Sequence, residues 1–532
     1  MAGHAPRPNQ EELPPGTAYI ESGRDQHVVR SPVPSSDPND PLNWTTGRKA
    51  LQITILSVYT LMVFASNTVS VPLYQDMSKD LNYSEEILDA SYAANSAALA
   101  FGSIIFVPFA MVFGRRVVYI VTSLIVFGCN VWSARTQGPA EIIAYNILLG
   151  LAGGSNESLW QMTVTDLFFV HQRGSINAIY FVMVMAGNFV APVPSGYIAQ
   201  AYGWRWSFWV TSIIVGTVSL CMILFLEESK YIRSGTDPTV ASTPSQPLQD
   251  PIKDSKTVAT ETSSSDSVEL NEKIPLRSYR QRLALFSAAS DFSVKSFLPL
   301  FYRPFVVLWR FPAVLLSASV YGFYIAAINI LGVTQTTLYA LPPYNFGTLG
   351  VATMNVPPAI GAVLGSAFGG PLVDRAIVVL ASRNQGVYQP EMRFWLVAVP
   401  IASMLIGILL YGLSIAQGMP WIISAVGAGF MGFGLGGAGD MGVTYLQDSY
   451  SKIIGLVFVG AAFIANMMST IFLFALTPWQ ASLGTYYLFV TLGCISLAIS
   501  LLTVPLIFYG KRWRTKGAEK YHRLVLAQTA SG

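Results

Sequence analysis

The chain alternates long apolar stretches with short polar segments, and twelve of these stretches reach about 20 residues, enough for a helix to cross a hydrocarbon core of about 30 Å. Only helices and closed barrels satisfy their backbone hydrogen bonds in lipid, and these stretches are too long and too continuously apolar for barrel strands. The pattern therefore predicts twelve membrane-spanning helices, at residues 50–74, 89–113, 117–134, 141–165, 175–199, 207–226, 311–338, 346–373, 394–413, 421–446, 453–476 and 486–509.

A long polar segment divides the predicted helices into two groups of six. Residues from Ser234 to about Lys273 are rich in Ser, Thr, Pro and Asp and show no apolar period, which is typical of a disordered spacer or of a phosphorylated loop. We expect an all-α membrane protein with two pseudo-symmetric six-helix bundles. The predicted units are a disordered cytoplasmic tail (1–47), a first bundle (48–226), a largely disordered cytoplasmic loop (227–303), a second bundle (304–510) and a cytoplasmic tail (511–532).

The distribution of positive charge predicts the orientation. If both termini are cytoplasmic, all but three of the 32 Lys and Arg residues lie on cytoplasmic segments, the exceptions being Lys79, Arg135 and Arg205. Such asymmetry is the rule for membrane proteins. This orientation places the sequon at Asn82 outside, where we expect glycosylation. The expected location is the plasma membrane, with the vacuolar membrane as the alternative.

Composition agrees with a membrane protein and excludes other classes. Hydrophobic residues make up 52% and charged residues 11% of the chain, with a mean hydropathy of +0.47, whereas soluble domains carry about 25% charged residues. The net charge of +3 is small and its residues are dispersed, which argues against nucleic acid as a partner. The three cysteines lie in apolar stretches and indicate neither a disulfide framework nor a metal site.

Two segments six spans apart resemble each other. The fourth span contains a glycine-rich run from Gly150 to Glu157, and the tenth contains one from Gly434 to Asp440. Superposing Gly150 on Gly434 aligns Asn156 with Asp440. Six-span halves related by a repeat are a transporter architecture that holds its substrate near the membrane midplane. We therefore expect a transporter, not an enzyme, that acts on small organic molecules within the bilayer.

Two acidic residues within the spans are candidates for coupling to an ion gradient. No phosphate-binding loop of the Gly-x4-Gly-Lys-Ser/Thr type is present, so we expect no nucleotide cofactor and a proton gradient as the driving force. Proton coupling requires a titratable group in the membrane. All four histidines lie outside the spans, and Glu157 and Asp440 are the two carboxylates away from span edges. The alternatives are a structural, hydrogen-bonded Glu157 and a gating role for Asp440.

Several motifs occur in the order known from one transporter family. They are Asp37–Trp44 before the first span, Asp166–Gly174 after the fourth, Gly203–Trp206 before the sixth and Tyr445–Tyr450 after the tenth. The chain resembles the major facilitator superfamily, specifically its fungal twelve-span branch that is similar to drug:proton antiporters. This resemblance extends over nearly all residues from 37 to 510.

The resemblance implies roles for further residues. Spans 1, 4, 7 and 10 would line the central cavity, where candidate substrate contacts are Asn67, Trp160, Gln161, Tyr321, Tyr324 and Asn329. Orientation and gating would involve Gly114, Arg115, Arg116, Asp166 and Arg173 in the first half, and Gly370, Asp374, Arg375 and Asp448 in the second. The loop motif of the first half is incomplete, because Met111 and Val112 stand where the family has Asp and Arg.

The fifth span resembles the antiporter motif of this family. It carries Gly187, Pro192 and Gly196, while Ala191 and Ser195 replace two glycines of the usual pattern. Small residues allow close helix approach and proline bends a helix. We interpret the motif as favouring a proton-coupled exporter of a drug, toxin or secondary metabolite that acts as a monomer. The alternatives are a proton-coupled importer of a nutrient or polyamine, and a non-transporting membrane sensor.

Overall fold

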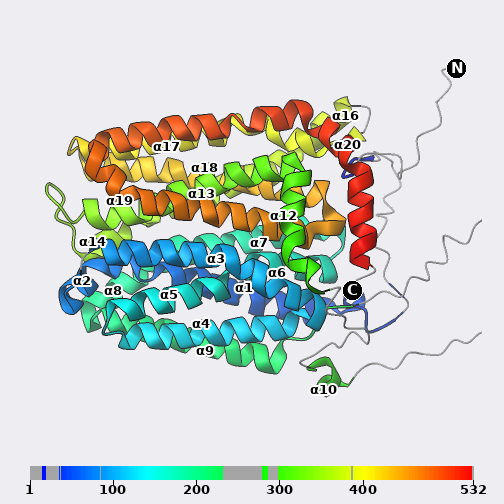
Figure 1. Cartoon of the computed structure of the whole chain (residues 1–532), viewed down its shortest axis with the longest axis horizontal. Coiled ribbons are helices and arrows are strands. Elements are labelled where there is room, and N and C mark those ends of the chain that lie inside the picture. The colour runs from blue at the N-terminus through cyan, green and yellow to red at the C-terminus, as the bar shows by residue number, and fades with distance from the viewer. Residues whose placement is uncertain are drawn as a thin grey trace, which may run out of the picture.

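Long helices follow the apolar stretches of the chain. The computed structural model describes residues 15–19, 35, 37–83, 85–231, 278–284, 297–384 and 387–529. The long helices run roughly parallel in one bundle, and the helices of the first half lie beside those of the second half (Figure 1). The expected all-α membrane fold is confirmed.

The first half consists of helices joined by short connections. The turn η4 and the helices α7 and α9 pack most closely on α1, which is buried along much of its length. The elements are η2 (Pro41–Asn43), α1 (Thr46–Thr68), η3 (Val71–Leu73), α2 (Tyr74–Leu81), α3 (Glu85–Phe113), α4 (Arg115–Arg135), α5 (Pro139–Gly154), α6 (Asn156–Leu167), α7 (Val170–Met185), η4 (Ala186–Val190), α8 (Pro192–Tyr202) and α9 (Trp204–Phe225).

The second half follows a short helix, α10 (Tyr279–Arg282). Its core is formed by α13, α15, α17, α18 and α19, which pack on one another. The elements are α12 (Pro299–Arg310), α13 (Pro312–Leu338), α14 (Thr348–Thr353), α15 (Val356–Ala367), η6 (Phe368–Leu372), α16 (Val373–Arg383), η7 (Pro390–Leu396), α17 (Ala398–Ala416), α18 (Trp421–Ser449), η8 (Ser451–Ile453), α19 (Ile454–Ser500) and α20 (Thr503–Thr529).

Ten helical stretches in the described ranges are long and apolar enough to cross a membrane. The predicted fourth span is not among them because it is interrupted at Ser155, between α5 and α6. The predicted eleventh and twelfth spans fall in one stretch, and the non-helical dihedral angles of Gly484 mark a kink inside its helix α19. The helices are therefore consistent with twelve spans, and that number stays a prediction.

Two of the long helices contain a π-helical turn. In the fifth predicted span, η4 separates α7 from α8, and in the eighth, η6 separates α15 from α16. Each turn contains a glycine of the motifs found in the sequence, Gly187 in η4 and Gly370 in η6. A π-turn adds a residue to one helical turn and shifts the faces that follow, and such turns are frequent at functional sites.

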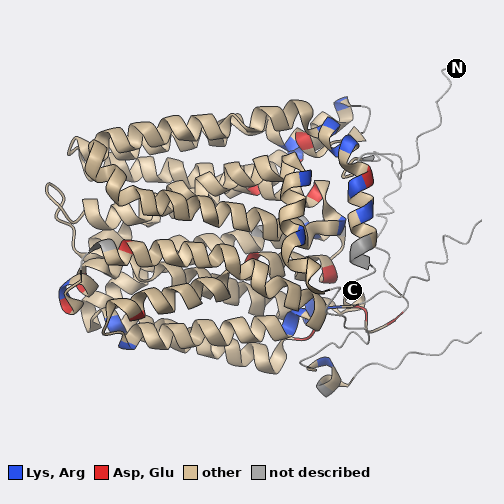
Figure 2. Ribbon diagram, viewed as in Figure 1, with Lys and Arg blue, Asp and Glu red and all other residues tan. Residues whose placement is uncertain are grey.

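Charged residues gather at one end of the bundle, which carries α10, α16 and the last turns of α20 (Figure 2). We name this end the terminal face and the other end the opposite face. At the terminal face β1 (Ala18–Tyr19) pairs antiparallel with β2 (Val387–Tyr388). Helix α20 runs past residue 510, where the sequence analysis ends the second bundle, because Arg514 and Tyr521 are buried there.

Candidate transport site

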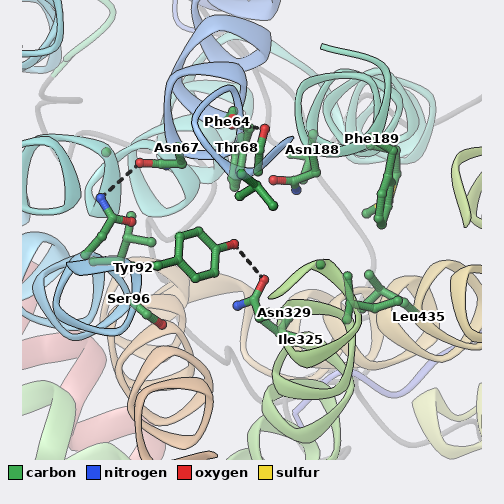
Figure 3. Close-up of a pocket in the computed structure, with 18 of the residues that line it drawn as sticks. Phe64, Asn67, Thr68, Tyr92, Ser96, Asn188, Phe189, Ile325, Asn329 and Leu435 are labelled. Carbon is green, nitrogen blue, oxygen red and sulfur yellow. Dashed lines mark hydrogen bonds between the residues drawn. The ribbon is translucent and has the colours of Figure 1, made fainter. Parts of the chain in front are cut away.

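A cavity of about 130 Å³ lies between the two halves. Phe64, Asn67 and Thr68 of α1 face it from one side, and Ile325 and Asn329 of α13 from the other (Figure 3). Drug-sized ligands usually occupy pockets of roughly 300–1,000 Å³. The cavity is thus too small for such a molecule, and the halves must separate to admit one.

Amide and aromatic side chains dominate the polar lining of this cavity. The amides are Asn67, Asn95, Asn188, Asn329, Asn355, Asn466 and Gln335, and the phenols are Tyr92, Tyr180 and Tyr321. Two hydrogen bonds between side chains connect the lining, from Asn95 Nδ2 to Asn67 Oδ1 at 3.2 Å and from Tyr92 Oη to Asn329 Oδ1 at 3.1 Å (Figure 3). The second bond joins the two halves.

Glu157 supplies the one carboxylate among the described residues that line the cavity, and no Lys, Arg or His lines it. It lies in the first turn of α6, directly after the interruption at Ser155. Its carboxylate makes no hydrogen bond or ion pair with the described residues, and it interacts electrostatically with the phenols of Tyr180 and Tyr321. The site therefore carries an uncompensated acidic group in a surrounding of neutral dipoles.

Three of the predicted substrate contacts lie elsewhere. Asn67, Tyr321 and Asn329 line the cavity as expected. Trp160 is fully buried, with its ring 5.2 Å from that of Tyr180, and Tyr324 Oη lies 2.9 Å from Ser500 Oγ. Trp160 therefore packs on α7, and Tyr324 packs on α19. Gln161 also lies outside the cavity, in a contact between the halves.

The sequence reasoning missed several lining residues. Tyr92, Asn95, Asn188, Asn355 and Asn466 come from spans 2, 5, 8 and 11, outside the four spans considered. A signal was present, because each asparagine is an uncharged polar residue within an apolar stretch. A count of amides over all twelve spans would have found them.

Hydrogen bonds between the halves close the cavity on both sides. Towards the terminal face, Gln447 Nε2 of α18 donates to Gln161 Oε1 at 2.5 Å, and Asn177 Nδ2 donates to Gln447 Oε1 at 2.9 Å. Towards the opposite face, Thr348 Oγ1 donates to Asp76 Oδ2 at 2.6 Å, and Gln75 Nε2 donates to the carbonyl of Thr336 at 3.1 Å. This arrangement corresponds to an occluded state.

The fifth-span motif lies between the cavity and neighbouring helices. A Cβ on Gly187 would stand 2.6 Å from the carbonyl oxygen of Leu61, and one on Gly196 would stand 2.5 Å from Cβ of Ala352 in the other half. Pro192 contributes to the cavity wall. Ser195, in place of a glycine, donates its hydroxyl to the carbonyl of Val69 at 3.3 Å. The motif residues thus permit close contact of α8 with both α14 and the first helix.

A charged cluster forms at the terminal face of the first half. Arg115 lies 3.1 Å from Asp166, which links the start of α4 to the end of α6. The carboxylate of Glu228, which the sequence reasoning missed, accepts hydrogen bonds from the backbone N–H groups of Arg115 (2.9 Å) and Arg116 (3.1 Å). Gly114 has φ +112°, and a Cβ there would collide with Glu228. Glycine at this position therefore allows the carboxylate to cap α4.

The other two predicted arginines of this face bind backbone carbonyls. Arg116 is buried and donates to the carbonyls of Leu226 at 2.6 Å and Ile223 at 2.8 Å. Arg173 donates to the carbonyls of Phe168 and Thr165, each at 3.2 Å. Both fix helix ends, because the last carbonyls of a helix have no partner within it.

The second half has a corresponding cluster built around Arg393. Its guanidinium lies 2.8 Å from Asp374 and 2.9 Å from Asp448, and Tyr388 Oη donates to Asp448 at 2.5 Å. Burial raises the pKa of the Tyr388 phenol, and the nearby Asp448 raises it further. Arg375, for which the sequence predicts a role in orientation and gating, is exposed, and Arg393, from the η7 turn, makes the contact with Asp374.

Asp440 lies outside the cavity lining. Its side chain is 7% exposed, and its Oδ2 atom is 3.0 Å from where a Cβ on Gly370 would stand. Gly370 therefore allows η6 to approach α18 at this carboxylate. Asp440 makes no hydrogen bond or ion pair with described side chains, although it interacts electrostatically with Arg393 and Asp374. Its place is between the cavity and the second charged cluster.

Asn82 lies on the opposite face, at the end of α2, in the left-handed conformation with φ 55°. Its side chain is exposed, and Ser84 of the sequon lies outside the described residues. Within the described ranges no three His, Cys, Asp or Glu side chains come together to hold a metal ion.

Known proteins resemble this chain over most of its length. A family model described as Major Facilitator Superfamily matches residues 56–457. An uncharacterized MFS-type transporter of Schizosaccharomyces pombe is 30% identical over 526 residues, covering 94% of this chain and 90% of the relative. Protein HOL1 of Saccharomyces cerevisiae is 29% identical over 532 residues, covering 92% and 90%.

A solved structure shows the same fold. The human organic anion transporter MFSD10 (TETRAN) matches with a TM-score of 0.56 and 14% identity, covering 86% of this chain and 99% of that one. The family match extends over most of the sequence and includes the residues that line the cavity, except Asn466. The chain therefore belongs to the major facilitator superfamily and is a membrane transporter, not an enzyme.

Proposed function

We propose that this transporter exports small organic cations in exchange for protons. The observation that carries the proposal is the position of Glu157, a lone carboxylate in a cavity whose other polar side chains are amides, phenols and the hydroxyls of Thr68 and Ser96. In a region of low dielectric constant an unpaired negative charge is costly. Either a proton or a cationic substrate neutralises it, and an anionic substrate would increase the cost.

The rest of the lining suits an amphipathic cation. Phe64, Phe189 and Tyr321 supply aromatic rings, whose faces attract cations. The amides both donate and accept hydrogen bonds, so they fit varied polar groups without adding charge. Drugs, toxins and secondary metabolites with a basic nitrogen meet these requirements.

Competition for Glu157 favours exchange over symport. If a proton and the cationic substrate neutralise the same carboxylate in turn, the halves reorient with one or the other bound, and the two move in opposite directions. Because protons flow inward across the plasma membrane, the substrate leaves the cell. The proton gradient is then the sole driving force, and the complete site lies within one chain, so a monomer suffices.

The central test uses purified protein in liposomes. Uptake of a fluorescent organic cation, such as rhodamine 6G, is measured under an imposed pH gradient for the wild type and for Glu157→Gln. We expect pH-driven flux of the variant to fall to background, because glutamine keeps the shape and loses the exchangeable charge, while cation binding weakens but persists. Asp440→Asn is the matched control and should retain pH-driven flux, since Asp440 lies outside the lining.

Three outcomes would contradict parts of the proposal. Unchanged pH-driven flux in Glu157→Gln would show that Glu157 has a structural role and does not couple transport to protons. Loss of coupling in Asp440→Asn alone would place coupling outside the cavity. If the wild-type protein transports no organic cation, the alternative of a non-transporting membrane sensor is favoured.

Measurements in intact cells determine the direction of transport. Overexpression should lower the accumulation of the cation in intact cells, and deletion should raise it. Higher accumulation on overexpression would assign import instead. A fluorescent fusion should appear at the plasma membrane; signal confined to the vacuolar membrane would make the vacuole the receiving compartment.

A further inference from the structure

Helix α12 (Pro299–Arg310) differs from the helices of the bundle in direction. It runs across the direction of the long helices, near the terminal face (Figure 1). It packs on α19 of the second half and on α3 of the first. The helix therefore crosses the seam where the two halves meet.

Aromatic rings of α12 contact both halves of the bundle. The ring of Phe301 lies 6.4 Å from that of Phe109 in α3, and the ring of Phe305 lies 5.0 Å from that of Phe463 in α19. Pro304 and Leu308 face Gly460 of α19. Ring pairs at these separations add to the free energy of apolar burial. Movement between the halves at this end must therefore change the contacts of α12.

The outer side of α12 is exposed and aromatic. Leu298, directly before the helix, Tyr302 and Trp309 are 65%, 56% and 87% exposed. Their spacing of four and seven residues places them on one side of the helix. Tryptophan and tyrosine are enriched where membrane meets water. This side is therefore suited to the boundary between head groups and acyl chains.

The positive charge of α12 indicates the chemical class of its partner. The helix contains Arg303 and Arg310 and no acidic residue, and Arg310, at its end, is exposed. Arginine extends its charged group from an apolar surface towards phosphates. An amphipathic helix with cations and aromatic residues lies in the membrane interface and binds anionic lipid.

We propose that the outer side of α12 binds anionic phospholipid in the leaflet at the terminal face, and that this lipid holds α12 across the seam between the halves. A second copy of the chain would require a self-complementary surface, and two arginines on one helix would repel their counterparts. Phospholipid supplies the opposite charge and matches the apolar side chains, and it is present along the whole rim of the bundle.

The first experiment locates the outer side relative to the membrane. Cys129, Cys221 and Cys494 are replaced by serine, and Trp309→Cys carries an environment-sensitive fluorophore in phosphatidylcholine liposomes. We expect quenching by lipids brominated near the head group. Asn82→Cys, exposed at the opposite face, should be quenched by aqueous iodide, and Ile471→Cys, exposed in α19, by lipids brominated deep in the chain. A Trp309 label that behaves like the Asn82 label would overturn the proposal.

The second experiment tests the preference for charge. Phosphatidylserine is titrated into nanodiscs that contain the labelled protein, with and without Arg310→Gln. One arginine near an anionic surface contributes about 1 kcal/mol, so apparent lipid affinity should fall about fivefold. Arg375→Gln removes an exposed arginine elsewhere at the terminal face and should leave the affinity unchanged.

Other results would contradict the proposal. An equal loss of affinity in Arg310→Gln and Arg375→Gln would mean unspecific attraction to the whole face. Fluorescence that changes with the protein-to-lipid ratio, and not with lipid charge, would assign the surface to a second copy of the chain. Neither measurement depends on transport, so a failure of the proposed export function would leave this test intact.

Discussion

Arg393 is the residue that organises the terminal face of the second half. Its side chain is 13% exposed and joins Asp374 of α16 to Asp448 of α18, two elements that would otherwise place like charges near one another. In the first half Arg115 and Asp166 make the corresponding link. A charged hydrogen bond contributes about 1.5–3 kcal/mol, and more is lost when the partner charge stays partly buried.

Replacing Arg393 by Gln should therefore destabilise the protein by about 2 kcal/mol and slow transport. The variant is purified in detergent, and its midpoint of thermal unfolding is compared with that of the wild type. Arg375→Gln is the control and should unfold like the wild type, because Arg375 is exposed. If both variants lose the same stability, the cluster around Arg393 does not stabilise this face.

Tyr388→Phe tests the same cluster through its hydrogen bond to Asp448. Loss of one hydrogen bond to a charged group should cost about 2 kcal/mol. Because burial and Asp448 raise the pKa of Tyr388 above its ordinary value, the phenol remains a donor over the physiological range. Its contribution is complete below about pH 10, the pKa in the unfolded chain, and disappears as pH rises through the folded value. The stability difference should therefore be constant from about pH 6 to pH 9; a decline within that range would contradict the assignment.

At the scale of elements, the N-terminal segment is attached to both halves. Residues 37–44 contact the first half, where Tyr231 Oη donates to Asp37 at 2.9 Å and Lys49 Nζ donates to the carbonyl of Leu42 at 3.0 Å. Strand β1 pairs with β2 of the second half. Gly16, beside β1, has φ +83°, and a Cβ there would stand 2.6 Å from the carbonyl oxygen of Asp448.

Gly16→Val should release β1 from the second half, because the substitution creates both a steric conflict and backbone strain, which costs about 1–3 kcal/mol. Hydrogen–deuterium exchange should then increase in residues 15–19 and 387–388 and stay unchanged in α4. Gly47→Val is the matched control, since a Cβ at Gly47 meets nothing within 4 Å. Protection of β1 that survives in Gly16→Val would show that the pairing does not require this glycine.

At the scale of the whole molecule, the cavity is closed on both sides by contacts between the halves. Gln161 and Gln447 meet towards the terminal face, and Asp76 and Thr348 meet towards the opposite face. Alternating access requires that each pair separates while the other stays closed. Locking either pair should therefore stop transport.

Cysteine pairs at these positions, in a background without native cysteines, test this expectation. A short bifunctional thiol reagent should join Gln161→Cys to Gln447→Cys, or Asp76→Cys to Thr348→Cys. Either link should reduce flux to background. Where the link is a disulfide, a reductant should restore flux. Ser66→Cys with Asn130→Cys is the control, since these residues meet within the first half at 3.0 Å. Full flux with either pair linked across the halves would exclude alternating access by separation of these pairs.

The sequence was informative wherever a property depends on neighbouring residues alone. Apolar length placed the helices, and a carboxylate within an apolar stretch singled out Glu157. The ion pair between Arg115 and Asp166 also joins two residues for which sequence motifs predict a role. By contrast, Trp160 and Tyr324 were expected in the cavity and lie outside it, whereas Tyr92 and Asn188 line it.

The sequence by itself determined the class of the protein, the family, the helical segments and the acidic group at the centre. Tertiary structure decided which side of each helix meets the cavity, because the packing of the helices and π-turns such as η4 set the side that faces it. It also decided the partners of the charged residues. Arg393 and Glu228 are distant in sequence from the groups they bind, and contacts of this kind exist only once the helices have packed.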